Sequence, residues 1–153
     1  MEKKLFTFSE IKQKMANYCV YQDRCHEEIE QKMREFVLIP EAKEEIILYL
    51  IKENFLNEER FVRSYIRGKF YIKGWGKNKI KIQLIQKKIN EKLISKCWNE
   101  IQDADYQEAL EKQYYDYYNK LKGLKDFQKK IKTTKYLLSK GFEYDDILSI
   151  SSV

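Results

Sequence analysis

The chain has 153 residues, of which 43% are hydrophobic and 35% are charged, and its formal net charge is +6. One proline and five glycines in this length favour helices over a turn-rich β architecture, in one domain or a short repeat array. No apolar run is long enough to span a membrane, and residues 1–10 lack the apolar stretch of a secretion signal. A cytoplasmic location is therefore expected.

Three helices are predicted before residue 57. Thr7 and Glu10 have the spacing of a capping box at the start of the first helix. Asp23 is predicted to cap the second helix, and Pro40 is predicted to lie in the first turn of the third. The apolar residues expected to face inward are Ile11, Met15, Tyr18, Ile29, Met33, Phe36, Ile46, Ile47 and Leu50.

Three further helices are predicted between residues 57 and 102. Asn57 is the expected cap of a long helix that ends at Gly74-Trp75-Gly76, while Asn78 and Asn90 open the next two. The residues expected to face inward are Phe61, Tyr65, Ile80, Leu84, Ile85, Leu93, Ile94, Cys97 and Trp98.

The last three helices are predicted from the same kinds of residues at their ends. Asp103 or Asp105 precedes the first, and Asp126 begins the second, which Gly141 is predicted to end in a left-handed conformation. The third covers residues 145–150. The apolar residues that mark these helices are Ala109, Leu110, Tyr114, Leu137, Leu138 and Ile150.

A pair of apolar residues five positions apart recurs at three predicted helix ends, with spacings of 51 and 53 residues. This periodicity predicts three copies of a three-helix unit, approximately residues 9–56, 57–102 and 103–153. The expected fold is a single all-α domain, an elongated and curved array of three tandem repeats. The six residues predicted to be buried at equivalent places are Met33, Leu38, Leu84, Ile89, Leu137 and Phe142.

Charge is concentrated in blocks along the chain. Residues 60–96 contain twelve bases and one acid, residues 60–90 contain no acid, and residues 120–140 carry a net charge of +7. Residues 23–59 and 97–119 are acidic, with net charges of −6 and −5. Separate basic and acidic faces favour a polyanion, or a partner with patterned charges, over a small neutral substrate.

The basic block supplies the candidate binding residues. Arg60, Arg63 and Arg67 share one helix face, and either a partner contact or simple solvation explains them. Trp75 and Tyr71 could stack on bases, or Trp75 could pack between units. The remaining candidates are Lys69, Lys73, Lys77, Lys79, Lys81, Lys87 and Lys88, with a second patch at Lys129, Lys130 and Lys132.

Enzymatic patterns are missing from the sequence. The run Gly74-Trp75-Gly76-Lys77 is no phosphate-binding loop of the G-x-x-x-x-G-K-[ST] type, and the lone His26 has no evident catalytic partners. The three cysteines, Cys19, Cys25 and Cys97, have neither a disulfide nor a zinc-site spacing. We expect free thiols, no cofactor, no metal and no catalysis.

The central block resembles the signature of the RecX family. The similarity lies in Asn57-Glu58-Glu59-Arg60-Phe61-Val62, Tyr65-Ile66-Arg67, Lys69, Lys73-Gly74-Trp75-Gly76 and Lys79-Ile80. Tyr136 to Phe142, followed by Tyr144-Asp145, resembles the closing motif of that family. Asn57 stands where the family usually has Asp, and Val37 and Lys88 stand where a glycine commonly ends the helix.

The resemblance implies regulation of recombination, DNA repair and the SOS response. RecX proteins bind the filament of the RecA recombinase on single-stranded DNA, along its deep groove, and suppress strand exchange and ATPase activity. It implies the same partner for this chain, with direct DNA binding weak, no membrane and a monomeric state. The alternatives are a helical module that binds nucleic acid directly and a helical adaptor for another protein.

Overall fold

A computed structural model describes residues 5–151. Its elements are α1 (Phe8–Tyr21), α2 (His26–Met33), α3 (Pro40–Lys52), α4 (Glu58–Arg67), the π-helical turn η1 (Gly68–Ile72), α5 (Lys77–Gln86), α6 (Glu91–Cys97), the 3₁₀ turn η2 (Trp98–Glu100), α7 (Asp103–Lys120), α8 (Asp126–Ser139) and α9 (Tyr144–Ser151). Within the described range there is no strand, and no helix is long and apolar enough to cross a membrane.

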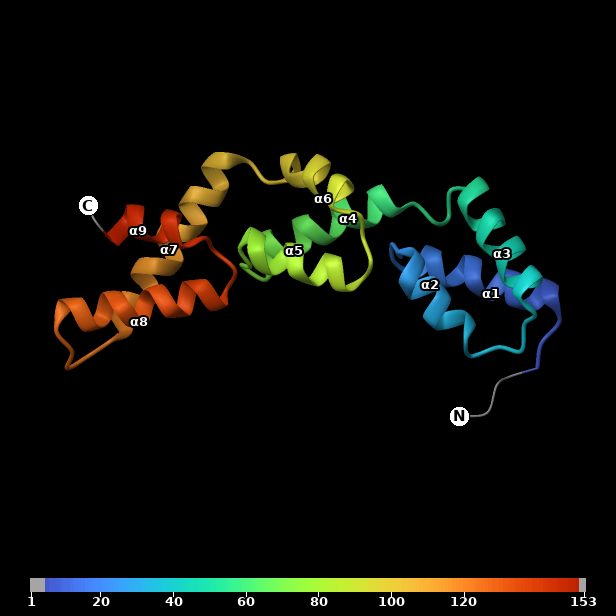
Figure 1. Ribbon diagram of the computed structural model, residues 1–153, viewed down its shortest axis with the longest axis horizontal. Helices are drawn as coiled ribbons and strands as arrows, with labels where there is room; N and C mark the ends of the chain where they lie inside the picture. Colours follow the sequence, from blue (N-terminus) through green and yellow to red (C-terminus); the bar gives the residue numbers. More distant parts are fainter. Residues whose placement is uncertain (1–4, 152–153) are drawn as a thin grey trace.

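The helices form an elongated row of three groups, with α1–α3 at one end and α7–α9 at the other (Figure 1). The main helix contacts join α1 to α2 and α3, α4 and α5 to α6, and α7 to α8 and α9. We call these groups the first, second and third unit. The all-α repeat array that the sequence predicts is confirmed.

Residues at the helix N-termini stabilise the start of the helices in the first unit. The Thr7 hydroxyl accepts a bond from the backbone N–H of Glu10, whose carboxylate accepts the N–H of Thr7, so the capping box is present. Pro40 occupies the first turn of α3. The predicted cap of α2 is wrong, because Cys25 occupies the N-cap position and Asp23 binds Arg60 instead.

In the second unit, the side chains of Asn57 and Asn90 cap α4 and α6 as predicted. Helix α5 begins one residue earlier than expected, at Lys77, with Gly76 as its N-cap. In the third unit Gln102 is the N-cap residue of α7, and α8 begins at Asp126.

The recurring apolar pair marks a helix C-terminus in two of the three units. Ile89 N–H donates to the Leu84 carbonyl, and Phe142 N–H donates to the Leu137 carbonyl, both at 3.1 Å. These bonds span five residues and close a Schellman motif, with the intervening Lys88 and Gly141 at φ 63° and 100°. Lys88 therefore adopts a left-handed conformation that usually favours glycine.

The first unit departs from this pattern. Helix α2 ends in hydrogen bonds that span three residues instead of five. The last of them runs from Phe36 N–H to the Met33 carbonyl. Phe36 is buried, whereas Leu38 is half-buried, so the prediction that Leu38 is buried like its counterparts is wrong. The five-residue closure occurs instead after α3, where Phe55 N–H donates to the Leu50 carbonyl and Asn54 has φ 60°.

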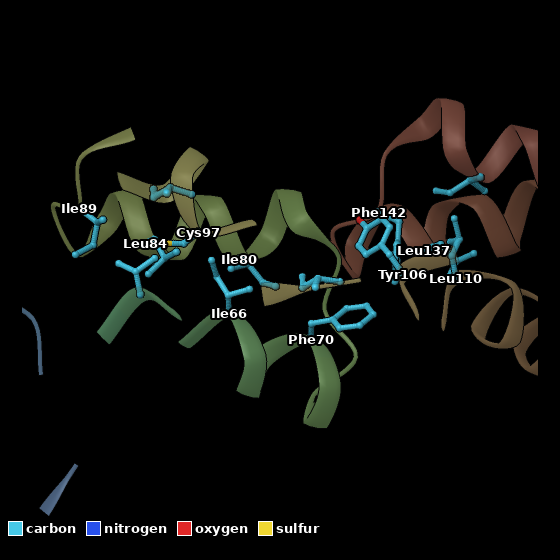
Figure 2. Packing of buried hydrophobic residues seen from close by; sticks show 14 of the residues in the cluster. Ile66, Phe70, Ile80, Leu84, Ile89, Cys97, Tyr106, Leu110, Leu137 and Phe142 are labelled. Carbon is cyan, nitrogen blue, oxygen red and sulfur yellow. The ribbon is translucent and has the colours of Figure 1, made fainter. Parts of the chain in front are cut away.

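Among the described residues, buried apolar side chains form two hydrophobic clusters. One lies within the first unit. The other contains residues of both the second and the third unit, several of which Figure 2 shows. Tyr106 joins these two units, because its ring centroid lies 5.5 Å from that of Phe70 and 5.4 Å from that of Phe142. Among residues 5–56, Cys25 is the one buried residue that belongs to the larger cluster.

Not every apolar residue of these helices lies in a core. Ile85 and Leu138 are 42% and 43% exposed. Ile47, which the sequence predicts to face inward, is half-buried and packs against the cluster of the first unit. Cys19, Cys25 and Cys97 are buried free thiols, as the sequence predicts, and burial raises the pKa of each.

Candidate functional site

The first arginine of the predicted row lies at the interface between the first and second units. Arg60 Nε is 2.8 Å from Asp23 Oδ1, and its NH2 group donates to the carbonyls of Asn54 and Phe55, both at 3.0 Å. These partners lie in the loops that flank the helices of the first unit. Arg60 therefore fastens the start of α4 to that unit.

The other two arginines converge on one carboxylate. Arg63 NH1 lies 3.1 Å from Glu100 Oε1, and Arg67 NH1 lies 2.9 Å from Glu100 Oε2. Arg63 Nε also binds Glu59 at 3.2 Å. Hydrogen bonds from Arg67 and Arg63 hold the pKa of Glu100 below its usual value. Acids from outside residues 60–90 thus neutralise much of the arginine charge.

Two of the predicted lysines also bridge the first two units. Lys87 Nζ is 3.4 Å from Glu28, and Lys88 Nζ is 3.2 Å from Glu27, both on α2. Lys81 lies 3.9 Å from Glu91, at the edge of ion-pair range. Lys87 and Lys88 therefore contribute to the interface between the first and second units, whereas Lys81 pairs within the second unit.

A different set of lysines gathers around Trp75, where the second unit meets the third. Lys69 Nζ and Lys79 Nζ lie 4.8 Å and 4.5 Å from the centre of the half-buried Trp75 ring, within the range of cation–π attraction. Lys73 is exposed and lines a hollow with Lys69. We call Lys69, Lys73, Trp75, Lys79 and Lys140 the Trp75 surface.

Lys140 is the member of the Trp75 surface that the sequence prediction missed. It precedes Gly141 in the third unit, and its Nζ donates to the backbone carbonyl of Lys73 at 3.2 Å. Burial, and then the charge of Lys79, lower the pKa of Lys140. Within residues 5–151, none of the four ammonium groups forms an ion pair with a carboxylate.

Close backbone contacts position the Trp75 surface. Gly76 N–H donates to the Lys140 carbonyl at 2.7 Å, and Asn78 N–H donates to the Gly141 carbonyl at 2.9 Å. A Cβ added to Gly76 would lie 2.4 Å from the carbonyl carbon of Gly141, so only glycine permits this approach. The lysines of two units are therefore held together by a rigid crossing of their chains.

A buried phenol reinforces the same crossing. The Lys77 backbone N–H donates to the Tyr106 hydroxyl at 3.0 Å, and burial raises the pKa of Tyr106 to about 12. The ammonium group of Lys77 lies 4.7 Å from the centre of the Tyr106 ring and 5.8 Å from that of Trp98. Lys77 thus contacts the ring of Tyr106, while Lys69 and Lys79 contact Trp75.

The second predicted patch lies on α8. Lys130 pairs with Asp126 at 3.4 Å, Lys129 lies 5.1 Å from the centre of the Tyr118 ring, and Lys132 is exposed. Tyr71 is also engaged, since its hydroxyl donates to Asp105 at 2.7 Å.

The Trp75 surface combines ammonium groups with an aromatic ring. No group of His, Cys, Asp and Glu within residues 5–151 could hold a metal ion, and His26 is exposed at the start of α2. Clustered ammonium groups beside aromatic rings attract phosphates or acidic protein surfaces. Fold and surface together define an all-α repeat protein whose second and third units meet at a lysine-rich surface, and these lysines form no ion pair within residues 5–151.

Comparison with known proteins identifies the repeat. Sequence models of the second and third three-helix domains of RecX match residues 57–97 and 103–150. The chain belongs to the RecX family. The crystal structure of RecX from Lactobacillus salivarius superposes with a TM-score of 0.86, at 27% identity, and covers 95% of this chain and 94% of that one.

Several curated relatives carry the name regulatory protein RecX. The protein of Streptococcus uberis is 31% identical over 152 residues, which are 97% of this chain and 57% of the relative. That of Serratia proteamaculans is 31% identical over 111 residues, which are 72% of this chain and 64% of the relative. The chain thus spans less than two thirds of the length of either relative.

Proposed function

We propose that this protein regulates the RecA recombinase without catalysis, by binding its filament on single-stranded DNA and inhibiting its activity. Membership in the RecX family and the names of the relatives support a regulatory role. An elongated array of units can contact several subunits along a filament. This role places the protein in the cytoplasm, in DNA recombination, repair and the SOS response.

The observation that carries the proposal is the Trp75 surface. Four ammonium groups are held on two adjoining units, and no ion pair among the described residues neutralises them. An anionic partner would therefore bind these ammonium groups without first breaking an ion pair within the protein. Phosphates of the filament DNA, or acidic groups of the recombinase, are suitable partners.

The three arginines take a different part in the proposal. Their bonds to Asp23, Glu59 and Glu100 shape the junction between helices, so their reversal to Glu would place like charges in contact. We propose that Arg60, Arg63 and Arg67 contribute to the filament contact only with the charge left over from these pairs. The lysines of the Trp75 surface carry the larger share.

The test is a charge reversal of Lys69 and Lys73 to Glu, compared with the same reversal of Lys52 and Lys92. All four side chains lie outside the ion pairs of the described residues, and both double variants change the net charge equally. Strand exchange by RecA should be inhibited on the order of tenfold less strongly by the first variant. The Lys52 and Lys92 variant should inhibit like the parent protein.

A pull-down completes the test. Immobilised protein is mixed with RecA assembled on single-stranded DNA, with RecA alone and with DNA alone. Retention of the assembled filament is expected, and loss of that retention should accompany the Lys69 and Lys73 reversal. Equal inhibition by both double variants would mean that the Trp75 surface is only solvated.

Direct binding of nucleic acid is the second candidate, because aromatic rings lie beside the same lysines. In that case naked DNA should be retained as strongly as the filament, with an affinity that falls steeply as salt rises. An adaptor for another protein would retain neither RecA nor DNA.

A further inference from the structure

The third unit carries an apolar groove that its own core does not use. The groove has a volume of about 460 Å³ and lies between α8 and α9. Ile131 and Leu138 line it from α8, and Tyr144 and Leu148 line it from α9, with exposed fractions of 53%, 43%, 54% and 39%. Four large apolar side chains on one groove exceed the scattered exposure that is normal at a protein surface.

Basic residues border this groove. Lys130 and Lys135 line it together with the apolar side chains, and Lys135 forms no ion pair within residues 5–151. The segment from residue 120 to residue 140 carries a net charge of +7. A complementary occupant therefore combines apolar side chains with acids on one helix face.

A face of this kind is present at the opposite end of the molecule, on α3. Its outer side, opposite the buried residues of the same helix, carries five residues at helical spacing, namely Glu41, Glu44, Glu45, Leu48 and Ile51. Leu48 and Ile51 are 59% and 43% exposed. The three carboxylates form no ion pair within the described part of the chain.

We propose that the outer face of α3 in one copy of this protein docks into the α8–α9 groove of another copy. Acids of the first copy would meet Lys130 and Lys135, while Leu48 and Ile51 would cover the apolar floor. The two surfaces lie on the first and third units, at opposite ends of the row (Figure 1). The contact is therefore between unlike surfaces, and each copy offers one of each kind.

A contact of one helix face with one groove is small, and small interfaces are weak. Dilute protein then remains monomeric, as the sequence analysis expects. Copies held side by side on a common partner experience a high effective concentration, which strengthens a weak contact without new interactions. The contact would make neighbouring copies load cooperatively.

The test is a charge-swap experiment on the isolated protein, followed by sedimentation velocity over a range of concentrations. One variant carries Glu44→Lys and Glu45→Lys, and the second carries Lys130→Glu and Lys135→Glu. Circular dichroism confirms that both are folded. A control with Lys120→Glu and Lys122→Glu changes the net charge as much as the groove variant.

Wild-type protein and the control should associate as concentration rises, and the association should weaken in high salt. Each swapped variant alone should associate about tenfold more weakly, because like charges then face each other. An equimolar mixture of the two should recover association, since a contact between the two different variants pairs opposite charges in either orientation. No single-surface explanation predicts this recovery.

Wild-type protein that stays monomeric at all concentrations overturns the proposal, as does a mixture no stronger than either variant alone. Loss of filament retention by the groove variant, with no self-association of the parent, would assign the groove to the recombinase. Because the sedimentation experiment contains neither RecA nor DNA, a failure to see self-association leaves the proposed regulatory function standing.

Discussion

The crossing between Gly76 and Gly141 yields a prediction that a matched set of glycines can test. A Cβ at Gly76 would lie 2.4 Å from both the carbonyl carbon and the oxygen of Gly141. Both contacts are with backbone, which cannot rotate away as a side chain can. Gly76→Ala therefore forces the second and third units apart, with a loss of about 1–3 kcal/mol in the free energy of unfolding.

Gly68 is the matched control for this substitution. It has a helical φ of −65°, and a Cβ there would meet nothing within 4 Å. Gly68→Ala should stabilise the protein by roughly 0.5–1 kcal/mol, because alanine loses less conformational freedom on folding. The two alanine variants should therefore deviate in opposite directions from the parent and differ from each other by about 1.5–4 kcal/mol.

A second pair of glycines distinguishes the cost of a strained backbone from the cost of a steric clash. Gly141 and Gly123 both have positive φ, at 100° and 70°, so alanine is strained at either position. A Cβ at Gly141 would lie 2.4 Å from Lys79 Cβ, whereas a Cβ at Gly123 would meet nothing within 4 Å. Gly141→Ala should therefore destabilise the protein more than Gly123→Ala.

Urea denaturation followed by circular dichroism measures all four variants. A shift of the midpoint at constant slope reports stability, and each kcal/mol corresponds to about 2–4 °C in the thermal midpoint of a chain of this size. Equal stability of Gly76→Ala and Gly68→Ala would refute the close crossing. It would also remove the structural basis for joining Lys140 to the lysines of the second unit.

Three further predictions concern the core and its junctions. Leu84→Ala should cost roughly 2–5 kcal/mol in urea denaturation, because Leu84 is fully buried, and should exceed the cost of Leu38→Ala, whose side chain is half-buried. The folded pKa of Tyr106 is about 12, above an ordinary value near 10, so its contribution is complete below pH 10 and is lost as pH rises towards 12. Tyr106→Phe should be less stable at neutral pH, because the Lys77 N–H loses its acceptor. It should also lose less stability at alkaline pH, as followed by circular dichroism, and an unchanged pH profile would contradict burial of the phenol. The ion pairs of Lys87 and Lys88 with α2 should weaken in high salt, so Lys87→Gln with Lys88→Gln should reduce the salt dependence of the thermal midpoint.

Much of the helical architecture could be predicted from local chemistry. The capping box of Thr7 and Glu10, the side-chain caps of Asn57 and Asn90, and Pro40 at a first turn each act within about one turn of helix. The recurring apolar pair correctly predicted the helix C-termini that the Ile89 and Phe142 N–H groups close, for the same reason. It failed at Leu38, because a shorter turn ends α2 and buries Phe36.

The electrostatic character of the candidate site was decided only by the tertiary structure. The sequence alone showed a stretch without acids, yet packing brings Asp23 to Arg60 and Glu100 to Arg63 and Arg67. Packing also brings Lys140 of the third unit beside the lysines around Trp75. Helix caps depend on neighbours along the chain, and sequence contains those neighbours. Charge neutralisation depends on distance in space, which the packing of the units alone determines.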